Sequence, residues 1–173
     1  MALFLKNSNF TALKKGLPFP DQKIHVARPA GTLAQSAAQN IFQVLGGRVR
    51  VKGLLAQVTT IVQAQATTVK TSSTAKDAAG ATVGTAVDLS STVDCNALEV
   101  GGLLWTEGDG TALVKSNAGA AFIGANSGEF IAPQGYISYT TGASSTGALK
   151  WDLWYEPVDE GAYVIAVPLA SGV

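Results

Sequence analysis

The chain has 173 residues and a mass of 17.7 kDa, which is enough for one ordinary hydrophobic core. Charged residues make up 14% of the sequence and hydrophobic residues 47%, which excludes a chain that is disordered throughout. Because 12 basic residues balance 12 acidic ones, the whole chain has no net electrostatic attraction to nucleic acid or to an anionic membrane. The single cysteine, Cys95, excludes an intramolecular disulfide and every metal motif that needs several cysteines.

The charges are nevertheless distributed unevenly along the chain. Residues 1–52 carry eight basic residues and one acidic residue, for a net charge of +7, whereas residues 53–173 carry a net charge of −7. Such a division indicates either that the basic part meets an acidic partner or that it pairs with the acidic part of the same fold. The pattern alone leaves both interpretations open.

Residues 1–35 are predicted to form an extended N-terminal arm. Pro18, Pro20 and Pro29 interrupt this segment, and no apolar spacing typical of a helix or a strand persists along it. Its phenylalanines and leucines are too numerous for a solvated tail, so we expect the arm to lie along another surface. That surface is either the protein's own body or a neighbouring subunit.

From residue 40 onward the pattern favours β-structure. The apolar run 41–44 ends at Gly46-Gly47, a pair that suits a tight turn with positive φ. Residues 48–52 alternate between basic residues and valines, as one strand with two different faces does. The β-branched residues of 54–70 favour a strand over a helix, which stays a minor alternative, and the small polar residues 71–85 predict a loop.

The rest of the chain reads as short strands separated by turns, and the Asp109-Gly110 pair is a hairpin signal. The predicted strands are 87–89, 93–95, 103–105, 112–114, 121–123, 129–132, 136–140, 148–156 and 162–167. Short strands at nearly regular spacing are typical of an antiparallel β-sandwich or a jelly roll. We therefore predict an all-β body over residues 36–173, preceded by the arm.

The strand at 148–156 has the clearest alternation. Leu149, Trp151, Leu153 and Tyr155 share one face, which is predicted to be the core face. Trp154 lies among charged residues on the opposite face and is a candidate subunit-interface residue. The alternative is a strand that is buried on both sides.

The residue types needed for catalysis are scarce. The only histidine, His25, lies in the predicted arm, where a catalytic base would be poorly fixed, and Cys95 has no cationic neighbour that would lower the pKa of its thiol. Asp152 and Glu156 share a strand face, but residues four apart on a strand are about 13 Å apart, too far for a glycosidase pair. We expect no enzymatic activity, no cofactor and no metal site.

We expect no secretory signal at the N-terminus, because only a short apolar run precedes Lys6 and no basic residue precedes that run. No stretch approaches the roughly 20 apolar residues of a membrane span. We expect a soluble protein that is made in a cytoplasm and has no membrane partner.

Two blocks of sequence resemble small virion structural proteins of tailed bacteriophages. The first is Ile41-Phe-Gln-Val-Leu-Gly-Gly-Arg-Val-Arg-Val followed by Val58-Thr-Thr-Ile-Val-Gln, and the second begins Gly147-Ala-Leu-Lys-Trp-Asp-Leu-Trp-Tyr-Glu-Pro. The most similar functional class is the capsid decoration, or cement, protein. The resemblance implies a protein that binds the major capsid protein on the outside of the head, commonly as a homotrimer, and that is made in the cytoplasm of a bacterial host.

In this interpretation the arm binds the capsid. Its phenylalanines would supply affinity by burial, and its basic residues would set register and capture rate against acidic shell residues. The residues assigned to this contact are Phe4, Lys6, Phe10, Lys14, Lys15, Phe19, Lys23 and Arg28. The alternative hypothesis is a carbohydrate-binding β-sandwich module of a phage fibre or adhesin, with sugars stacked on Trp154, Tyr136 or Tyr139.

Overall fold

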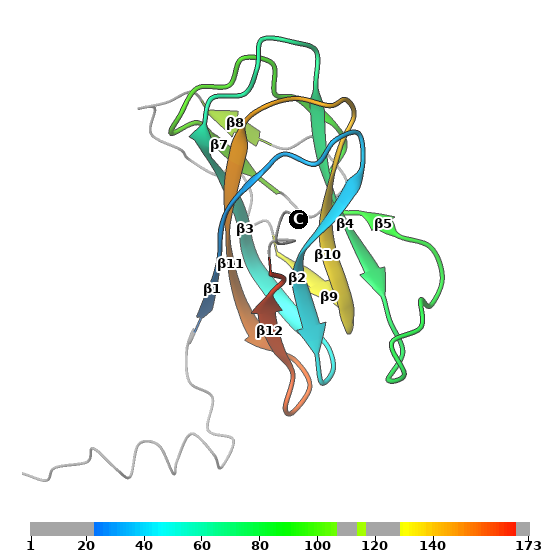
Figure 1. Cartoon of the computed structure of the whole chain (residues 1–173). Helices are drawn as coiled ribbons and strands as arrows, with labels where there is room; N and C mark the ends of the chain where they lie inside the picture. The colour runs from blue at the N-terminus through cyan, green and yellow to red at the C-terminus, as the bar shows by residue number, and fades with distance from the viewer. Residues whose placement is uncertain (1–22, 107–113, 117–128, 169–173) are drawn as a thin grey trace, which may run out of the picture.

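The computed structural model describes residues 23–106, 114–116 and 129–168. The regular secondary structure of these residues consists of β-strands. The strands form two antiparallel sheets that face each other (Figure 1). The first sheet has the order β1 (Ile24–Thr32), β11 (Ala148–Pro157), β3 (Val49–Thr60), β7 (Leu103–Trp105) and β8 (Val114–Ser116), and β9 (Phe130–Ala132) also pairs with β3. The second has the order β12 (Tyr163–Ala166), β2 (Ala38–Leu45), β10 (Gly135–Thr141), β4 (Thr68–Ala75) and β5 (Val87–Asp88), and β6 (Val93–Asp94) also pairs with β4.

The strand pairs are nested in the sequence. β4 pairs with β5 and β6, β3 with β7, β2 with β10, and β1 with β11. The chain is therefore one long antiparallel ribbon that is rolled up so that its successive strand pairs alternate between the two sheets. This is the topology of a jelly roll. The prediction of an all-β sandwich or jelly roll is confirmed.

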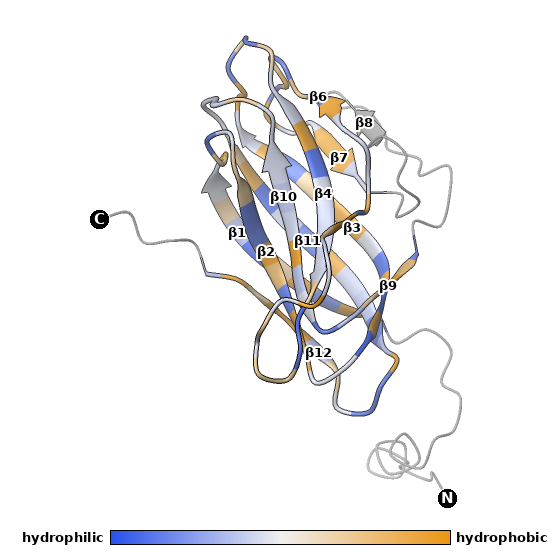
Figure 2. Ribbon diagram, turned by 90° about the vertical axis from the view of Figure 1, so that its right-hand side faces the viewer, coloured by the Kyte–Doolittle hydropathy of each residue, from blue (hydrophilic) through white to orange (hydrophobic). Residues whose placement is uncertain are grey.

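The hydrophobic core lies between the two sheets, as the alternating sequence patterns predict. Leu149, Trp151, Leu153 and Tyr155 of β11 are all buried, while the residues between them are partly exposed. Figure 2 shows hydrophobic residues in orange and hydrophilic residues in blue interspersed along the strands of both sheets. Cys95 is buried and behaves as a small hydrophobic residue, as expected. The core-face prediction for β11 is confirmed.

The turn between β2 and β3 uses the predicted glycine pair. Gly46 and Gly47 have φ values of 74° and 138°, which glycine adopts without the strain that a side chain would cause. Next to this turn, Asp159 accepts hydrogen bonds from the backbone and guanidinium of Arg48 at 2.7 to 3.0 Å. These bonds connect the β2–β3 turn to the hairpin between β11 and β12, and they hold the pKa of Asp159 at about 2.

The region between residues 54 and 85 differs from the prediction. The predicted strand 54–70 is divided, because β3 runs from Val49 through Gly53 to Thr60 and β4 begins at Thr68. Residues 71–75, predicted as loop, belong to β4. Thr71, Ser72 and Ser73 of this segment are buried. The buried hydroxyl of Thr71 finds polar partners on other parts of the chain, since it is 3.1 Å from that of Ser90 and 3.2 Å from that of Thr106. Small polar composition was therefore a misleading indicator of a loop.

The arm also ends earlier than predicted. Residues 24–32 form β1, which pairs with β11 from Ile24 opposite Tyr155 to Thr32 opposite Ala148. The prolines were misleading because β1 is an edge strand, and Pro29 falls where its register shifts, a place where a missing N–H is tolerated. This part of the predicted arm is thus a strand of the sandwich. Residues 1–22, the predicted strand 121–123 and the predicted hairpin at Asp109-Gly110 lie outside the described residues.

Candidate functional site

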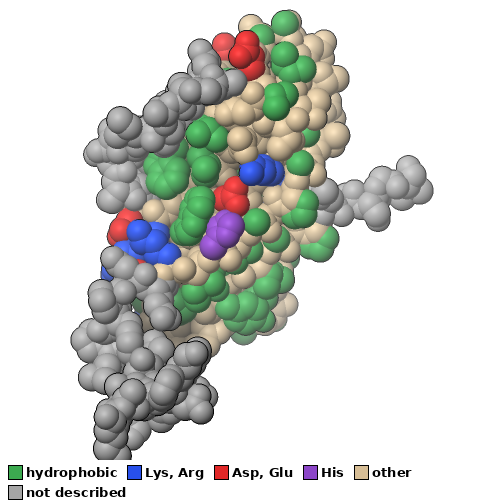
Figure 3. All heavy atoms as spheres, turned by 90° about the vertical axis from the view of Figure 1, so that its left-hand side faces the viewer, with side chains coloured by type: hydrophobic (Ala, Val, Ile, Leu, Met, Phe, Trp, Pro, Cys, Tyr) green, Lys and Arg blue, Asp and Glu red, His purple; other side chains and the backbone are tan. Residues whose placement is uncertain are grey.

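A groove of about 280 Å³ lies on the outer face of the first sheet. It is lined by Lys23, Lys52, Trp105 and Trp154. These residues come from the start of the described chain, from β3, from β7 and from β11. In the space-filling view of this face, the purple histidine lies beside exposed hydrophobic side chains in green and near a cluster of blue lysine and arginine side chains (Figure 3). The described part of the N-terminal region therefore begins at the groove.

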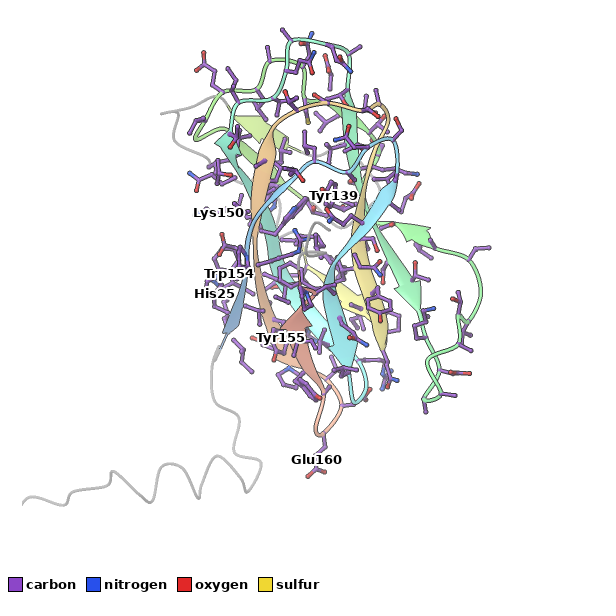
Figure 4. All side chains as sticks on the ribbon, in the orientation of Figure 1. His25, Tyr139, Lys150, Trp154, Tyr155 and Glu160 are labelled. Atoms are coloured by element: carbon purple, nitrogen blue, oxygen red, sulfur yellow. The ribbon has the colours of Figure 1, made fainter. Side chains whose placement is uncertain are left out.

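Trp154 is held in place by its neighbour on the edge strand. His25 lies opposite Trp154 in the register of β1 and β11, and the two rings stack with centroids 5.0 Å apart and planes 20° apart. Nε2 of His25 is 2.8 Å from Oδ1 of Asp152, and since a carboxylate only accepts, the imidazole donates this hydrogen bond. The Asp152 carboxylate orients the imidazole, and the imidazole covers one face of the indole. Both His25 and Trp154 lie on the outer side of β11 (Figure 4).

Trp105 is placed by a glycine on the neighbouring strand. Gly53 lies opposite Trp154 in the register of β3 and β11, and the ring of Trp105 reaches over Gly53 from β7. A Cβ atom built at Gly53 would overlap that ring. Gly53 thus forms the floor between the two tryptophans, and only the absence of a side chain there allows Trp105 to lie so close to the sheet.

Lys52 is the charged residue at the base of the groove. The register of β3 and β11 passes from Val51 to Gly53, so Lys52 is the extra residue of a β-bulge. Its Nζ atom is 2.9 Å from Oε1 of Glu129 and 3.4 Å from Oε2 of Glu156, and its side chain is only 10% exposed. The hydrogen bond to Glu129 raises the pKa of Lys52, so the ammonium stays charged at neutral pH and is balanced locally by two carboxylates.

The structure describes two of the eight residues assigned to the capsid-binding arm. Lys23 is exposed and lines the groove. Arg28 is only 2% exposed, so the assignment of Arg28 to an external contact is wrong. The other six, which lie outside the described residues, are Phe4, Lys6, Phe10, Lys14, Lys15 and Phe19.

Arg28 is buried because it occupies a core-facing position of β1, opposite Trp151 of β11. Its Nε atom donates a hydrogen bond to the backbone carbonyl of Val167 at 3.2 Å. Its Nη2 atom is also buried and has no hydrogen-bond partner among the described residues. Burial lowers the pKa of Arg28, which shows how unfavourable this environment is for the charge.

The three aromatic residues of the carbohydrate hypothesis do not converge. Tyr139 is buried between the sheets, where its hydroxyl donates to Oε1 of Gln39 at 2.6 Å, so it cannot stack on an external sugar. Tyr136 is half-buried on the second sheet, with Nζ of Lys76 5.9 Å from its ring centroid. Trp154 is half-buried on the outer face of the first sheet, as its pattern predicted.

Trp105 and Gly53 are the site residues that sequence reasoning missed. The strand at 103–105 was predicted, but its pairing with β3 was not. Gly53 appears in the sequence only as a bend or bulge between two strand-like runs. The pairing of β3 with β11 and β7, which brings the two tryptophans to one glycine, depends on the whole topology.

A second hollow of about 260 Å³ lies where β4, β5 and β9 meet. Val83, Val87 and Ile131 line it and are exposed at 53%, 63% and 57%. Apolar residues gathered in this way commonly mark an interaction surface.

Within the described ranges, no three His, Cys, Asp or Glu side chains are grouped in a way that would hold a metal ion. The same residues contain no helix of the length and apolar character that crossing a membrane requires. No family model, no curated protein and no solved structure matches this chain.

Proposed function

We propose that the protein is a non-enzymatic structural protein of a tailed-phage virion, which binds the outside of the capsid and stabilises the shell. The observation that carries this proposal is the composition of residues 1–22, which precede the first strand of the β body and interleave phenylalanines with lysines. The described residues build two sheets and a core that extends from Leu33 to Val164. Lys23, the residue that follows this basic, aromatic segment, lines the groove.

The jelly roll supports the proposal only by analogy, because viral capsid and lectin domains both use this architecture. The composition of the first 23 residues is more specific. With the boundary corrected, the capsid-binding residues are Phe4, Lys6, Phe10, Lys14, Lys15, Phe19 and Lys23. Phenylalanines interleaved with lysines suit a partner surface, here the major capsid protein, that offers apolar hollows bordered by acidic residues.

Self-association, as a homotrimer, is part of the proposal. We assign it to the hollow lined by Val83, Val87 and Ile131, because these exposed side chains would be covered by a second copy. Trp154 was the earlier candidate for this interface. It is the weaker candidate, since its indole is already stacked on His25 and half-buried within its own chain.

The test is to locate the protein in purified particles of the phage that encodes it. Peptide identification should find it in virions, and antibody-gold labelling in the electron microscope should place it on the outer surface of the head. Absence from purified virions, or labelling confined to the tail, would overturn the proposal. Val87→Asp should reduce the sedimenting species to a monomer, and the exposed Val100→Asp serves as a matched control.

A further inference from the structure

We propose that the groove between Trp105 and Trp154 is a binding site for a neutral saccharide, with the sugar ring stacked on an indole. The juxtaposition that supports this site is two tryptophans from different strands, separated by a glycine and bordered by charged side chains. The site does not depend on attachment to a capsid, so it can be tested independently of the proposed function.

The chemistry of the groove matches that of a pyranose. One face of a pyranose presents C–H bonds, and these pack on the electron-rich face of an indole, which carries the negative part of the ring quadrupole. The hydroxyl groups around the sugar ring need donors and acceptors at the edge of the platform. Lys23 and Lys52 supply donors, and Glu156, which is 3.4 Å from Lys52, supplies an acceptor.

The charges favour a neutral sugar over an acidic one. The Lys52 ammonium is already balanced by Glu129 and Glu156, and Asp152 adds a further carboxylate on the same face. The two lysines that line the groove are offset by these three neighbouring carboxylates, so an acidic sugar would gain no net attraction, whereas a neutral sugar can exchange hydrogen bonds with both kinds of group. The groove volume, about 280 Å³, lies just below the usual range of ligand pockets and suits a short stretch of a surface polysaccharide.

Both indoles are fixed before a ligand arrives. Trp154 is stacked on His25, which Asp152 orients, and Trp105 lies against the backbone at Gly53. Fixed aromatic side chains lose little conformational entropy on binding, so the contact area that they offer is converted into affinity more fully. His25 and Gly53 are therefore positioning residues for the site.

The test uses the full chain on an array of neutral and acidic oligosaccharides, followed by titration of the strongest glycan with tryptophan fluorescence as the readout. We expect binding to neutral hexose oligosaccharides. Trp154→Ala and Trp105→Ala should each weaken binding at least about tenfold, as loss of an aromatic anchor does. Gly53→Ala and His25→Ala should weaken it by a smaller factor and shift the tryptophan fluorescence, because each changes the surroundings of one groove indole. The matched control, Tyr163→Ala, removes an exposed aromatic side chain from the second sheet and should leave binding unchanged.

Circular dichroism of each variant confirms that the fold is retained. The proposal is overturned if no neutral glycan binds the full chain, or if binding survives unchanged in both tryptophan variants. It is also overturned if the tryptophan variants alter the oligomeric state and no glycan binds, because the groove would then be a contact between copies. Selective binding of acidic glycans would contradict the charge argument and with it the ligand class.

Discussion

The phenol ring of Tyr139 packs against the indole of Trp151, with ring centroids 5.3 Å apart and planes tilted by 31°. Tyr139 belongs to β10 of the second sheet and Trp151 to β11 of the first, so this contact joins the two layers of the jelly roll. Both side chains are almost fully buried. Three residues further along β11, Trp154 lies on the opposite face and is only half-buried.

The two tryptophans of β11 should therefore differ in their contribution to stability. Trp151→Ala is expected to lower the free energy of unfolding by about 3–5 kcal/mol, because a large cavity would open between the sheets. Trp154→Ala should lower it by about 1 kcal/mol, since part of that indole already meets water and its loss opens no cavity between the sheets. Urea denaturation of both variants measures the difference. Equal losses would contradict the assignment of the two faces.

Gly53→Ala should disturb Trp105 by direct overlap. We expect a loss of about 1–3 kcal/mol in the free energy of unfolding, as for other overpacked positions, together with a change in tryptophan fluorescence. In the Trp105→Ala background the same substitution should be nearly neutral, because the overlapping ring is gone. A double-mutant cycle measures this coupling, and additive effects would show that the ring does not limit the position.

Arg28 gives an expectation opposite to that for a surface arginine. Arg28→Met keeps the length of the side chain and removes a buried Nη2 that has no partner in the described part of the chain, so stability should be unchanged or rise by up to about 3 kcal/mol. Arg28→Ala should instead lower stability by about 2–4 kcal/mol through the cavity that it leaves. Thermal and urea unfolding test both. A large loss in Arg28→Met would show that the guanidinium makes stabilising contacts.

The ion pair between Arg48 and Asp159 should make stability depend on pH in the acid range. The pKa of Asp159 is about 2 in the folded protein, below the ordinary value of 3.8, because Arg48 donates hydrogen bonds to it. A carboxylate whose pKa is lowered by folding stabilises the protein above its unfolded pKa, and this stabilisation is lost as the pH falls through the folded pKa. The difference in free energy of unfolding between the natural protein and Asp159→Asn should thus be constant from pH 7 to pH 5 and shrink between pH 4 and pH 2.

Unfolding curves collected across this range measure that difference. Glu160→Gln removes the same charge from the exposed neighbouring position of the hairpin and controls for a general effect of net charge. A difference that persists undiminished at pH 2 would mean that Asp159 acts through something other than its charge.

The proposed capsid contact predicts that burial contributes more than charge. Replacing Phe4, Phe10 and Phe19 by alanine should abolish reattachment to virions stripped of the protein, at about 1.5–3 kcal/mol for each fully buried ring. The matched change of Lys6, Lys14 and Lys15 to alanine should weaken it modestly, at about 0–1 kcal/mol for each exposed pair. The occupancy of each variant on stripped virions, measured at low and high salt, distinguishes the contribution of burial from that of charge. A larger loss in the lysine variant, with a steep salt dependence, would contradict this order.

The sequence predicts which side chains are buried wherever the alternation within a single strand is sufficient to distinguish its two faces. The period of two along 149–155 correctly separates Trp151 from Trp154 because one side of β11 meets the core and the other does not. The same prediction fails where the burial of a side chain depends on strands that are distant in the sequence. Arg28 looks like an arm residue until β11 pairs with β1 and turns it inward, and Tyr139 looks like a sugar platform until the second sheet buries it.

The groove was predictable only in part for the same reason. Trp154 was singled out by its charged neighbours on the outward face. Its partnership with Trp105 requires two separate strand registers to meet at Gly53, and no local pattern carries that information. Pro29 misled the prediction, because a proline indicates an irregular arm but is also tolerated in an edge strand such as β1.

The nested strand pairing also has a consequence during synthesis. His25 and its partner Asp152 are 127 residues apart in the chain, so β1 cannot be paired until almost the whole polypeptide has left the ribosome. Until then β3 lacks β11 as well, and the first sheet has unpaired edges while the innermost pairs of the ribbon are already available. We expect the growing chain to close from the middle of its sequence outward. Its first strand, β1, is therefore among the last to be joined to the body, together with β12, which follows β11 in the chain and pairs with β2.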